Sequence, residues 1–467
     1  MVFSSISFLY YFLPVALFLY FIIPNKFKNL VLLLVSLVFY FYGEQHYILI
    51  LLFSAVVDYT CARMIEKFRG KKTAKLFLAV SIIANIGLLM FFKYFDFFTG
   101  NANNAFGMSM PLLKIALPIG ISFFTFQTMS YTIDVYRGEI PAQRNFITLF
   151  TYVALFPQLI AGPIVRYKTI ETELSHRTHS VYKFGEGAQR FIIGIAKKVL
   201  FANQLGALIE VFRASNEKSV LFYWIYAVAL SLQIYFDFSG YSDMAIGLGK
   251  MFGFSFPENF NYPYISKSIA EFWRRWHISL GSWFKDYVFI PLGGSRVKLP
   301  KWLRNVLIVW LLTGLWHGAD WPFIAWGMFI AVFLIAEKLF LSSLFAKLPS
   351  VFSRLYFLFI ILLSMVIFNG DGINGSVNDI ISLFGGEGLV LYNSETAYYL
   401  SSNAILLIAA AVGATPMAKI ALSWLRERKR SGYILTFAEP IICSALLITV
   451  TAYLIDGSFN PFLYFRF

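Results

Sequence analysis

The sequence has few charged residues. Only 14% of its 467 residues are Asp, Glu, Lys or Arg, whereas 58% are hydrophobic and 19% are aromatic. Because a soluble domain carries about a quarter charged residues, this composition excludes an ordinary soluble enzyme. Repeated apolar runs instead predict an all-α polytopic protein of the membrane. No internal repeat or linker interrupts them, so residues 1–467 are predicted to form a single domain.

Cysteine is almost absent. Cys61 and Cys443 both lie in apolar runs, which excludes a disulfide framework and a cysteine-based metal site. Glycine-rich phosphate loops and serine elbows of the Gly-x-Ser-x-Gly type are missing as well. His176 and His179 have a spacing that permits metal binding, but the sequence places no third ligand near them. We therefore expect a solvated loop there, and no metal.

Acidic residues are fewer than basic ones, and the formal net charge is +14. Lys and Arg gather in the cytoplasmic loops of membrane proteins, so this excess does not indicate a nucleic-acid partner. Basic residues cluster in 63–75, 166–198 and 426–430, whereas 99–110 and 370–396 contain neither Lys nor Arg. The basic segments are predicted to be cytoplasmic and the other two extracytoplasmic, with membrane lipid around the helices between them.

Apolar runs of about 20 residues, or somewhat fewer where a helix is buried, predict membrane crossings. Both chain termini are then extracytoplasmic, and the run at 8–23, which lacks a basic start and a cleavage site, stays as a helix. The twelve predicted crossings are 5–23, 29–43, 46–62, 75–98, 111–136, 191–212, 219–240, 303–317, 321–337, 353–369, 397–417 and 434–455.

Two further segments, 145–165 and 258–295, combine apolar or aromatic residues with prolines and glycines that break helices. Irregular backbone at membrane depth is tolerated only where protein buries it or where it faces a cavity. Both segments are therefore predicted to be re-entrant or interfacial and to line a central cavity.

Two of the five histidines lie in the stretch 271–318, each directly after a tryptophan. His317 ends an apolar segment that starts at Arg304 and is about 20 Å long at about 1.5 Å per residue. The hydrocarbon core is about 30 Å thick, so His317 is expected below the outer surface. Gly314 and Gly318 allow another backbone or a substrate to approach it. A neutral imidazole there accepts a proton from a hydroxyl; the alternative is a helix-end histidine bonded to a neighbour.

The second histidine, His277, lies in an amphipathic segment with Trp273, Arg274, Arg275 and Trp276. At helical spacing, Trp273 and His277 share a face. In a functional interpretation, the arginines clamp phosphates of an acyl donor while the histidine orients an acceptor. The alternative is an interfacial helix whose Trp and Arg residues anchor at the lipid headgroups. Residue types alone favour this alternative.

Two acidic residues, Asp237 and Asp243, lie in or at the end of an apolar run. Carboxylates within the membrane face a cavity, pair with a cation, or both. The candidate partners are Arg274, Arg275 and Lys250. We expect structural ion pairs that support the site rather than direct catalysis.

Taken in order, these motifs resemble the membrane-bound O-acyltransferase family, in particular its bacterial branch typified by alginate O-acetyltransferases. The matching motifs are Pro-Gln-Leu-Ile-Ala-Gly-Pro-Ile at 157–164, the aspartates at 237–243, Asn-Phe and Pro-Tyr at 259–264, 272–280, Asp-Tyr at 286–287, Pro-Leu-Gly-Gly at 291–294, Gly-Leu-Trp-His-Gly at 314–318 and the ending 460–467.

The resemblance implies a ring of about twelve membrane helices and re-entrant segments around a tunnel that reaches the active site from both faces. It implies that His317 is the catalytic residue and that His277 is a second functional histidine lining the same tunnel. The other candidates for contacting substrate or lining the tunnel are Trp273, Arg274, Arg275, Trp276, Asp286, Trp316, Gln158, Asp237 and Asp243.

The protein is expected to lie in the bacterial inner membrane and to transfer an acyl group, with acetyl favoured. The expected donor is a cytoplasmic thioester such as acetyl-CoA, and the expected acceptor is an extracytoplasmic polysaccharide. No bound cofactor is expected. The resemblance also implies an extracytoplasmic acetyltransferase-like partner protein. The alternatives are D-alanyl transfer to teichoic acid and, in a different class, a transporter or flippase for a lipid-linked saccharide.

Overall fold

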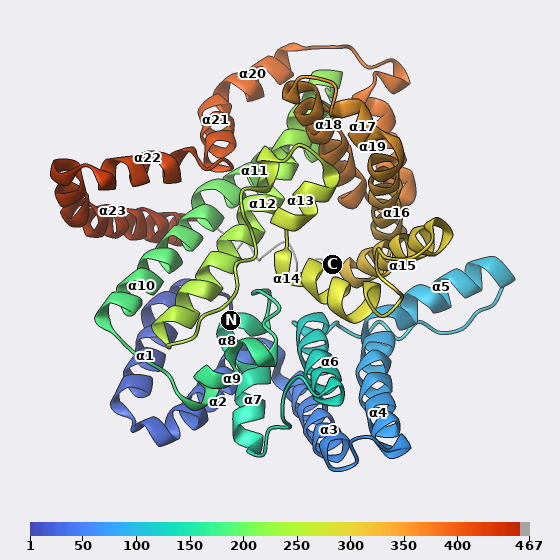
Figure 1. Ribbon diagram of the computed structural model, residues 1–467. Coiled ribbons are helices and arrows are strands. Elements are labelled where there is room, and N and C mark those ends of the chain that lie inside the picture. The colour runs from blue at the N-terminus through green and yellow to red at the C-terminus, as the bar shows by residue number, and fades with distance from the viewer. Residues whose placement is uncertain (458–467) are drawn as a thin grey trace. The chain divides into compact units, whose positions relative to one another are not determined.

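The computed structural model describes residues 1–457, except for the side chains of Glu387 and of residues 429–432. This part of the chain consists of helices joined by turns and loops, without a β-strand (Figure 1). The predicted all-α class is therefore confirmed. The motif at 460–467, one of those that carry the family resemblance, lies outside the described residues.

The chain folds into two compact units, one formed by Met1–Phe191 and Ser242–Pro257, the other by Ile192–Tyr241 and Glu258–Phe467. The boundary between the units falls within α10 (Val181–Ala196) and α12 (Val220–Met251), so each of these helices contributes residues to both. The single domain over 1–467 stays a prediction.

The first unit is built around α6, whose residues are nearly all buried and which packs against α3 and α4. A buried polar cluster joins two of these helices: the Asp58 carboxylate on α3 accepts hydrogen bonds from Ser81 Oγ (2.5 Å) and Asn85 Nδ2 (2.8 Å) on α4. The helices of this unit besides α10 and α12 are α1 (Leu13–Ile22), α2 (Lys28–Glu44), α3 (Ile48–Lys67), α4 (Lys72–Leu89), α5 (Phe95–Phe106), α6 (Ile121–Arg137), α7 (Phe146–Ala154), α8 (Phe156–Leu159) and α9 (Tyr167–Ser175).

The second unit has a large apolar core to which α11, α12, α13, α16 and α18 contribute. Its helices besides α10 and α12 are α11 (Asn203–Ala214), α13 (Ile269–Arg275), α14 (Ile278–Phe284), α15 (Leu299–His317), α16 (Trp321–Ala336), α17 (Ser342–Phe345), α18 (Ser350–Phe368), α19 (Gly372–Leu383), α20 (Ser394–Ser402), α21 (Ala404–Gly413), α22 (Met417–Glu427) and α23 (Lys429–Asp456).

Short π-helical and 3-10 turns extend or join these helices. The π-helical turns are Ser7–Phe12, Met90–Tyr94, Lys197–Ala202, Lys285–Phe289 and Glu337–Leu341, and the 3-10 turns are Asn25–Phe27, Gln45–Tyr47, Pro263–Ile265 and Gly386–Gly388. Both segments predicted to be broken are broken: 145–165 contains only α7 and α8, and 258–295 contains α13, α14 and short turns.

In the described part of the chain, seven helices are long and apolar enough to cross a membrane, or eight if α20 and α21, bent by 54°, form one span. The polytopic membrane class is thus confirmed, whereas the predicted count of twelve crossings is not. The predicted crossings 29–43 and 46–62 form one helical run here. The seven spans are Asn25–Lys67, Lys72–Phe106, Val181–Ala214, Val220–Met251, Trp321–Phe345, Ser350–Phe368 and Tyr433–Asp456.

One predicted crossing, 111–136, is wrong in its first half. Residues 108–118 are not helical, and α6 begins at Ile121. Pro111 and Pro118 disfavour the helical backbone on their N-terminal side. The irregular segment is held instead by Asp96 on α5, whose carboxylate accepts the backbone N–H groups of Leu113 (2.7 Å) and Lys114 (2.8 Å).

Helices α15 and α16 form a tightly packed hairpin (Figure 1). A Cβ atom added to Gly314 on α15 would lie 2.4 Å from the carbonyl oxygen of Phe323 on α16, and one added to Gly318 would lie 2.2 Å from the Phe323 ring. Real Cβ atoms do not approach other atoms so closely. The glycines are therefore required so that α16 can pack against the end of α15 that carries His317.

We expect Gly314→Ala to destabilise the protein by about 1–3 kcal/mol, because overpacking against a backbone oxygen forces the two helices apart. Gly87→Ala on α4 is the matched control, since a Cβ there meets nothing within 4 Å. It should leave the melting temperature unchanged or raise it, because Ala favours a helix by up to about 1 kcal/mol over Gly. Thermal unfolding of both variants in detergent measures the difference. Equal melting temperatures would contradict the packing argument.

Candidate active site

His277 lies between α13 and α14 in a left-handed backbone conformation, with φ of 43° and ψ of 53°. This conformation is uncommon for a residue other than glycine and costs about 1–3 kcal/mol. Helix α13 starts with a Ser268 cap, whose Oγ accepts the N–H of Glu271 (3.0 Å), and it ends at Arg275. The strained residue therefore marks a sharp reversal between two short helices.

The reversal is held by Asn259, which the sequence analysis included in a motif but did not name as a site residue. Its backbone carbonyl accepts the N–H of Ile278 (3.0 Å). Its side-chain Oδ1 accepts the backbone N–H of Ser279 (3.2 Å) and the Ser279 hydroxyl (2.8 Å). One asparagine thus satisfies several donors where the chain is not helical.

Asn259 also sets the tautomer of His277. The distance from His277 Nδ1 to Asn259 Oδ1 is 3.2 Å. Because a carboxamide oxygen only accepts, Nδ1 carries the hydrogen in this bond, and a neutral imidazole then has its lone pair on Nε2. Burial lowers the pKa of His277, and the nearby His317 imidazole lowers it further, so the neutral form of His277 is favoured. Nε2 is buried and has no hydrogen-bond partner among residues 1–457.

His317 is the last residue of α15 and is 7% exposed. Its ring packs edge-on against Trp326, with a centroid distance of 5.1 Å, and against Phe368 at 5.2 Å. Helix α15 begins five residues before Arg304, the predicted start, and its 19 residues are about 28 Å long at about 1.5 Å per residue. The predicted start of this segment is therefore wrong, and the expected depth of His317 in the membrane stays a prediction. Its burial rests on packing.

The two histidines meet at one indole ring. The Trp316 ring centroid lies 5.7 Å from that of His277 and 5.1 Å from that of His317. Phe238 on α12 closes the other side of His277 at 4.6 Å. The structure therefore brings together His277, His317 and Trp316, which are 40 residues apart in sequence at most.

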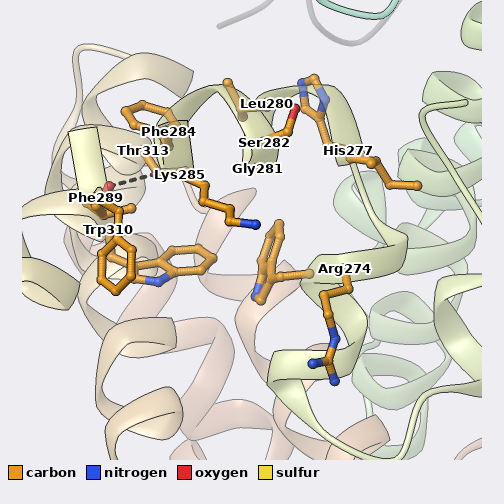
Figure 2. A pocket seen from close by; sticks show the side chains of 13 residues that line it. Arg274, His277, Leu280, Gly281, Ser282, Phe284, Lys285, Phe289, Trp310 and Thr313 are labelled. Carbon is orange, nitrogen blue, oxygen red and sulfur yellow. Dashed lines mark hydrogen bonds between the residues drawn. The ribbon is translucent and has the colours of Figure 1, made fainter. Parts of the chain in front are cut away.

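A cavity of about 380 Å³ opens beside His277. Its walls include Trp273, Arg274, Lys285 and Trp310. In Figure 2, His277 and the Arg274 guanidinium lie at opposite ends of the view, and the Lys285 side chain extends between them. Sequence reasoning missed Lys285, although a lysine directly before the Asp-Tyr motif was a usable signal.

A second cavity of about 490 Å³ adjoins the first, since Arg274, Phe289, Val309 and Trp310 line both. Glu337 and Lys338 line its other part. The Glu337 carboxylate accepts the backbone N–H groups of Ile269 (2.6 Å) and Ala270 (3.1 Å) at the start of α13. Glu337 thus fixes the start of α13, the helix that carries Arg274. The sequence signal for Glu337 was an acidic residue within the apolar run that begins at 321.

Arg275 and Trp276 turn away from the cavity, although each was predicted to contact substrate or line the tunnel. The Arg275 guanidinium pairs with Glu271, with Nη2 2.9 Å from Oε1. The Trp276 ring stacks on Phe272 at 5.3 Å in the apolar core. Asp286 lies half-buried in the π-helical turn that begins at Lys285.

Both aspartates pair with cations, as predicted, but the predicted partners are wrong. Asp237 pairs with Lys198 at 2.5 Å, and both side chains are buried. Asp243, in the first unit, pairs with Arg190 at 2.9 Å. The local sequence around a carboxylate does not show which distant cation faces it. Arg274, Arg275 and Lys250 were therefore predicted as partners without a tertiary contact to support them. Gln158 also lies in the first unit, where its Nε2 donates to the carbonyl of Tyr152 (2.6 Å).

Among the described residues, no group of three or more His, Cys, Asp or Glu side chains is arranged to hold a metal ion. The side chains gathered around the first cavity and Trp316 include two imidazoles, an arginine, a lysine and several indole rings.

Comparisons with known proteins agree with the order of the motifs. Residues 37–370 match the profile of the membrane-bound O-acyltransferase family. The chain is 46% identical over 344 residues to a probable alginate O-acetylase of Pseudomonas aeruginosa, an alignment that covers 72% of this chain and 66% of the relative. It is 31% identical to a peptidoglycan O-acetyltransferase of Helicobacter pylori, covering 100% of this chain and 98% of the relative.

A teichoic acid D-alanyltransferase of Bacillus subtilis is 32% identical over 241 residues, which cover 48% of this chain and 59% of the relative. The chain spans about two thirds of the length of the alginate relatives that it matches. His277, His317 and Asn259 all lie within the residues that match the family profile.

We expect Asn259→Ala to destabilise the protein by about 1–3 kcal/mol, because the buried N–H of Ser279 and Nδ1–H of His277 lose their acceptor. Asn261→Ala is the matched control, since that side chain is exposed and only its backbone bonds to Arg275. Thermal unfolding in detergent should show a lower melting temperature for the first variant alone. The same melting temperature in both would show that Asn259 does not hold the reversal.

Proposed function

We propose that this chain, which belongs to the family of membrane-bound O-acyltransferases, transfers an acetyl group from a cytoplasmic thioester. The proposed acceptors are hydroxyl groups of an extracytoplasmic polysaccharide. The family and the apolar helices identify it as a multi-pass protein of the bacterial inner membrane. Acetyl-CoA is the proposed donor. The relatives that support a polysaccharide acceptor are an alginate O-acetylase and a peptidoglycan O-acetyltransferase.

The observation that carries the proposal is the contact of Trp316 with both imidazole rings beside a cavity. A hydroxyl group is a poor nucleophile at neutral pH, and a positioned base supplies about 10²–10⁴-fold in rate. His317 accepts the proton of the acceptor hydroxyl in this proposal. His277 positions the donor or the acceptor through the lone pair that Asn259 leaves on Nε2.

The reaction forms the C–O bond of the ester and breaks the C–S bond of the thioester, while a proton moves from the hydroxyl to the sulfur. The acceptor oxygen attacks the thioester carbonyl carbon while His317 takes the hydroxyl proton, and the tetrahedral intermediate then expels the thiolate. The protonated histidine returns the proton to the sulfur, so the products are the ester and the free thiol. Direct transfer is simpler than an acyl-enzyme, because the sequence offers no nucleophile motif.

Arg274 is the proposed contact for the phosphates of the donor. Its guanidinium lines both cavities, and no described carboxylate lies within 4.0 Å of it. A planar guanidinium binds phosphate oxygens bidentately. Trp273, Lys285 and Trp310 line the space between this residue and His277. Asp237 supports the second unit through its ion pair with Lys198, and the predicted tunnel-lining roles of Asp243, Gln158, Asp286 and Trp276 stay predictions.

An extracytoplasmic acetyltransferase-like protein is the proposed partner, which would complete delivery to the polymer. The family resemblance supports this partner.

A second candidate function is D-alanyl transfer to teichoic acid, which the Bacillus subtilis relative favours at 32% identity over about half of this chain. The higher identity to the alginate O-acetylases and the full coverage of the peptidoglycan O-acetyltransferase favour acetyl transfer. A saccharide transporter of a different class would also use buried Arg, Asp and His residues, but it would not need a basic imidazole.

We expect His317→Gln to lower acetylation of exported polysaccharide by roughly 10²–10⁴-fold, because glutamine keeps hydrogen bonding but provides no base. His277→Asn should retain more activity, since asparagine tolerates the left-handed backbone at this position and keeps a polar group there. The measurement is ester-linked acetyl per unit of exported glycan, with the amount of membrane-inserted protein determined in parallel.

The exposed His46 provides the matched control, and His46→Gln should acetylate normally. Glycan export should be unchanged in all three variants. Near-normal acetylation by His317→Gln would make this residue structural, and a loss of glycan export instead of acetylation would favour a transporter.

Arg274→Lys should raise the KM for acetyl-CoA roughly tenfold, because a lysine replaces a bidentate contact with a point charge. Arg275→Lys should have a smaller effect, since Glu271 already engages that guanidinium. Arg354→Lys, an exposed site on α18, should have none. Steady-state kinetics with purified protein compares the three, and equal KM values for acetyl-CoA in all of them would remove Arg274 from the donor site.

A further inference from the structure

A separate cavity of about 470 Å³ lies in the first unit, where three helices end. Phe21 stands next to the last residue of α1, Val181 is the first residue of α10, and Met251 is the last residue of α12. Two candidate spans, Val181–Ala214 and Val220–Met251, begin or end at this cavity. Because membrane helices end near the membrane–water interface, we expect the cavity at the level of the lipid headgroups. The adjoining basic segment 166–198 was predicted to be cytoplasmic.

The walls of this cavity are apolar on one part and basic on another. Phe21, Val181, Phe184 and Met251 supply the apolar part, and Val181 is 91% exposed. The basic part consists of His179, Lys183 and Lys250. Such a combination fits a ligand that has both an anionic group and a hydrocarbon chain.

Two more cations lie directly behind the wall. Lys28 Nζ lies 4.8 Å from the Tyr20 ring centroid and 5.8 Å from that of Phe21, and Arg177 Cζ lies 5.7 Å from that of Tyr20. The Tyr20 hydroxyl is 2.8 Å from His179 Nε2, which joins these cations to the cavity wall. Partial burial and the charges of Lys28 and Arg177 lower the pKa of His179.

The positive charge is only partly compensated within the protein. Lys250 pairs with Glu186 at 3.4 Å, and Glu173, near Arg177, accepts the backbone N–H of Ser255 (2.9 Å). No carboxylate among the described side chains lies within 4.0 Å of the side-chain nitrogens of Lys28, Arg177 or Lys183. Lys183 instead donates to the Thr178 hydroxyl (2.8 Å). An anion from outside the protein would therefore be favoured here.

We propose that this cavity, formed by the ends of α1, α10 and α12, binds the phosphate group of an anionic phospholipid from the cytoplasmic leaflet. Basic pockets between membrane helices on the cytoplasmic side are suited to anionic headgroups. Lys183 and Lys250 contact the phosphate, and Lys28 and Arg177 add attraction from behind. The acyl chains lie along Phe21, Val181 and Phe184.

A soluble phosphate would use the same cations but not the apolar wall. The exposed apolar residues around the cavity gain nothing from a small hydrophilic anion, whereas they pack against the acyl chains of a lipid. The site is also distinct from the cavity beside His277, which belongs to the second unit.

Native mass spectrometry of the purified full chain in detergent tests the proposal, with phosphatidylglycerol and phosphatidylcholine that carry identical acyl chains as probes. The wild type should bind phosphatidylglycerol more tightly. The double variant Lys183→Gln/Lys250→Gln should bind it roughly tenfold to thirtyfold more weakly, at about 1 kcal/mol for each lysine lost. Binding of phosphatidylcholine should not change.

Lys71→Gln/Lys72→Gln is the matched control, since it removes two exposed lysines from another basic segment predicted on the same side of the membrane. It should leave the affinity for phosphatidylglycerol unchanged. Equal affinity of the wild type for both lipids, or an equal loss in both double variants, would overturn the proposal. Glycerol 1-phosphate at millimolar concentration should not displace the lipid; displacement would identify a soluble phosphate as the ligand and would also overturn it.

Discussion

A polar group inside this protein has to find its partner within the protein, because hydrocarbon offers no hydrogen bonds and an unpaired group there costs several kcal/mol. Asp58 is satisfied by Ser81 and Asn85, and Asp237 by Lys198. The first pairing ties α3 to α4, and the second ties α12 to the π-helical turn after α10. The cost of an unpaired polar group limits the number of polar residues in the chain. It also favours those buried polar residues that bond to a neighbouring helix.

At the candidate active site the constraint acts on irregular backbone. His277 interrupts a helix in a conformation that costs about 1–3 kcal/mol, and the donors freed by the interruption are bonded to Asn259. On the opposite wall, Gly314 lets α16 approach the end of α15. The Asn259 side chain and the absence of a side chain at Gly314 thus help to place the His277 and His317 rings against the Trp316 indole. Neither Asn259 nor Gly314 contacts substrate in the proposed reaction.

The sequence predicted what depends on composition and local order: the all-α membrane class, most apolar helices, the broken segments and the family. It did not predict what depends on tertiary partners. The sequence suggested the same phosphate-binding role for Arg274 and Arg275. The structure shows that the Arg275 guanidinium already pairs with Glu271. Gly314 was expected to make room for a backbone or a substrate, and its neighbour is the backbone of α16. Hydropathy also hid the irregular segment at 108–118, since its Met, Leu and Ile residues outweigh two prolines in the mean hydropathy.

The geometry of the two adjoining cavities suits a donor whose two ends differ in charge. Arg274 lies where the cavities meet, and Trp273 and Trp310, with ring centroids 4.8 Å apart, line the way from there to His277. Indole rings exclude water, and a base in a dry environment stays neutral because burial penalises the imidazolium. Phosphates, by contrast, need a cation and tolerate water. In the proposed reaction the indoles therefore separate the charged end of the donor from a dry end beside His277, whose ring contacts the same Trp316 indole as the proposed base, His317.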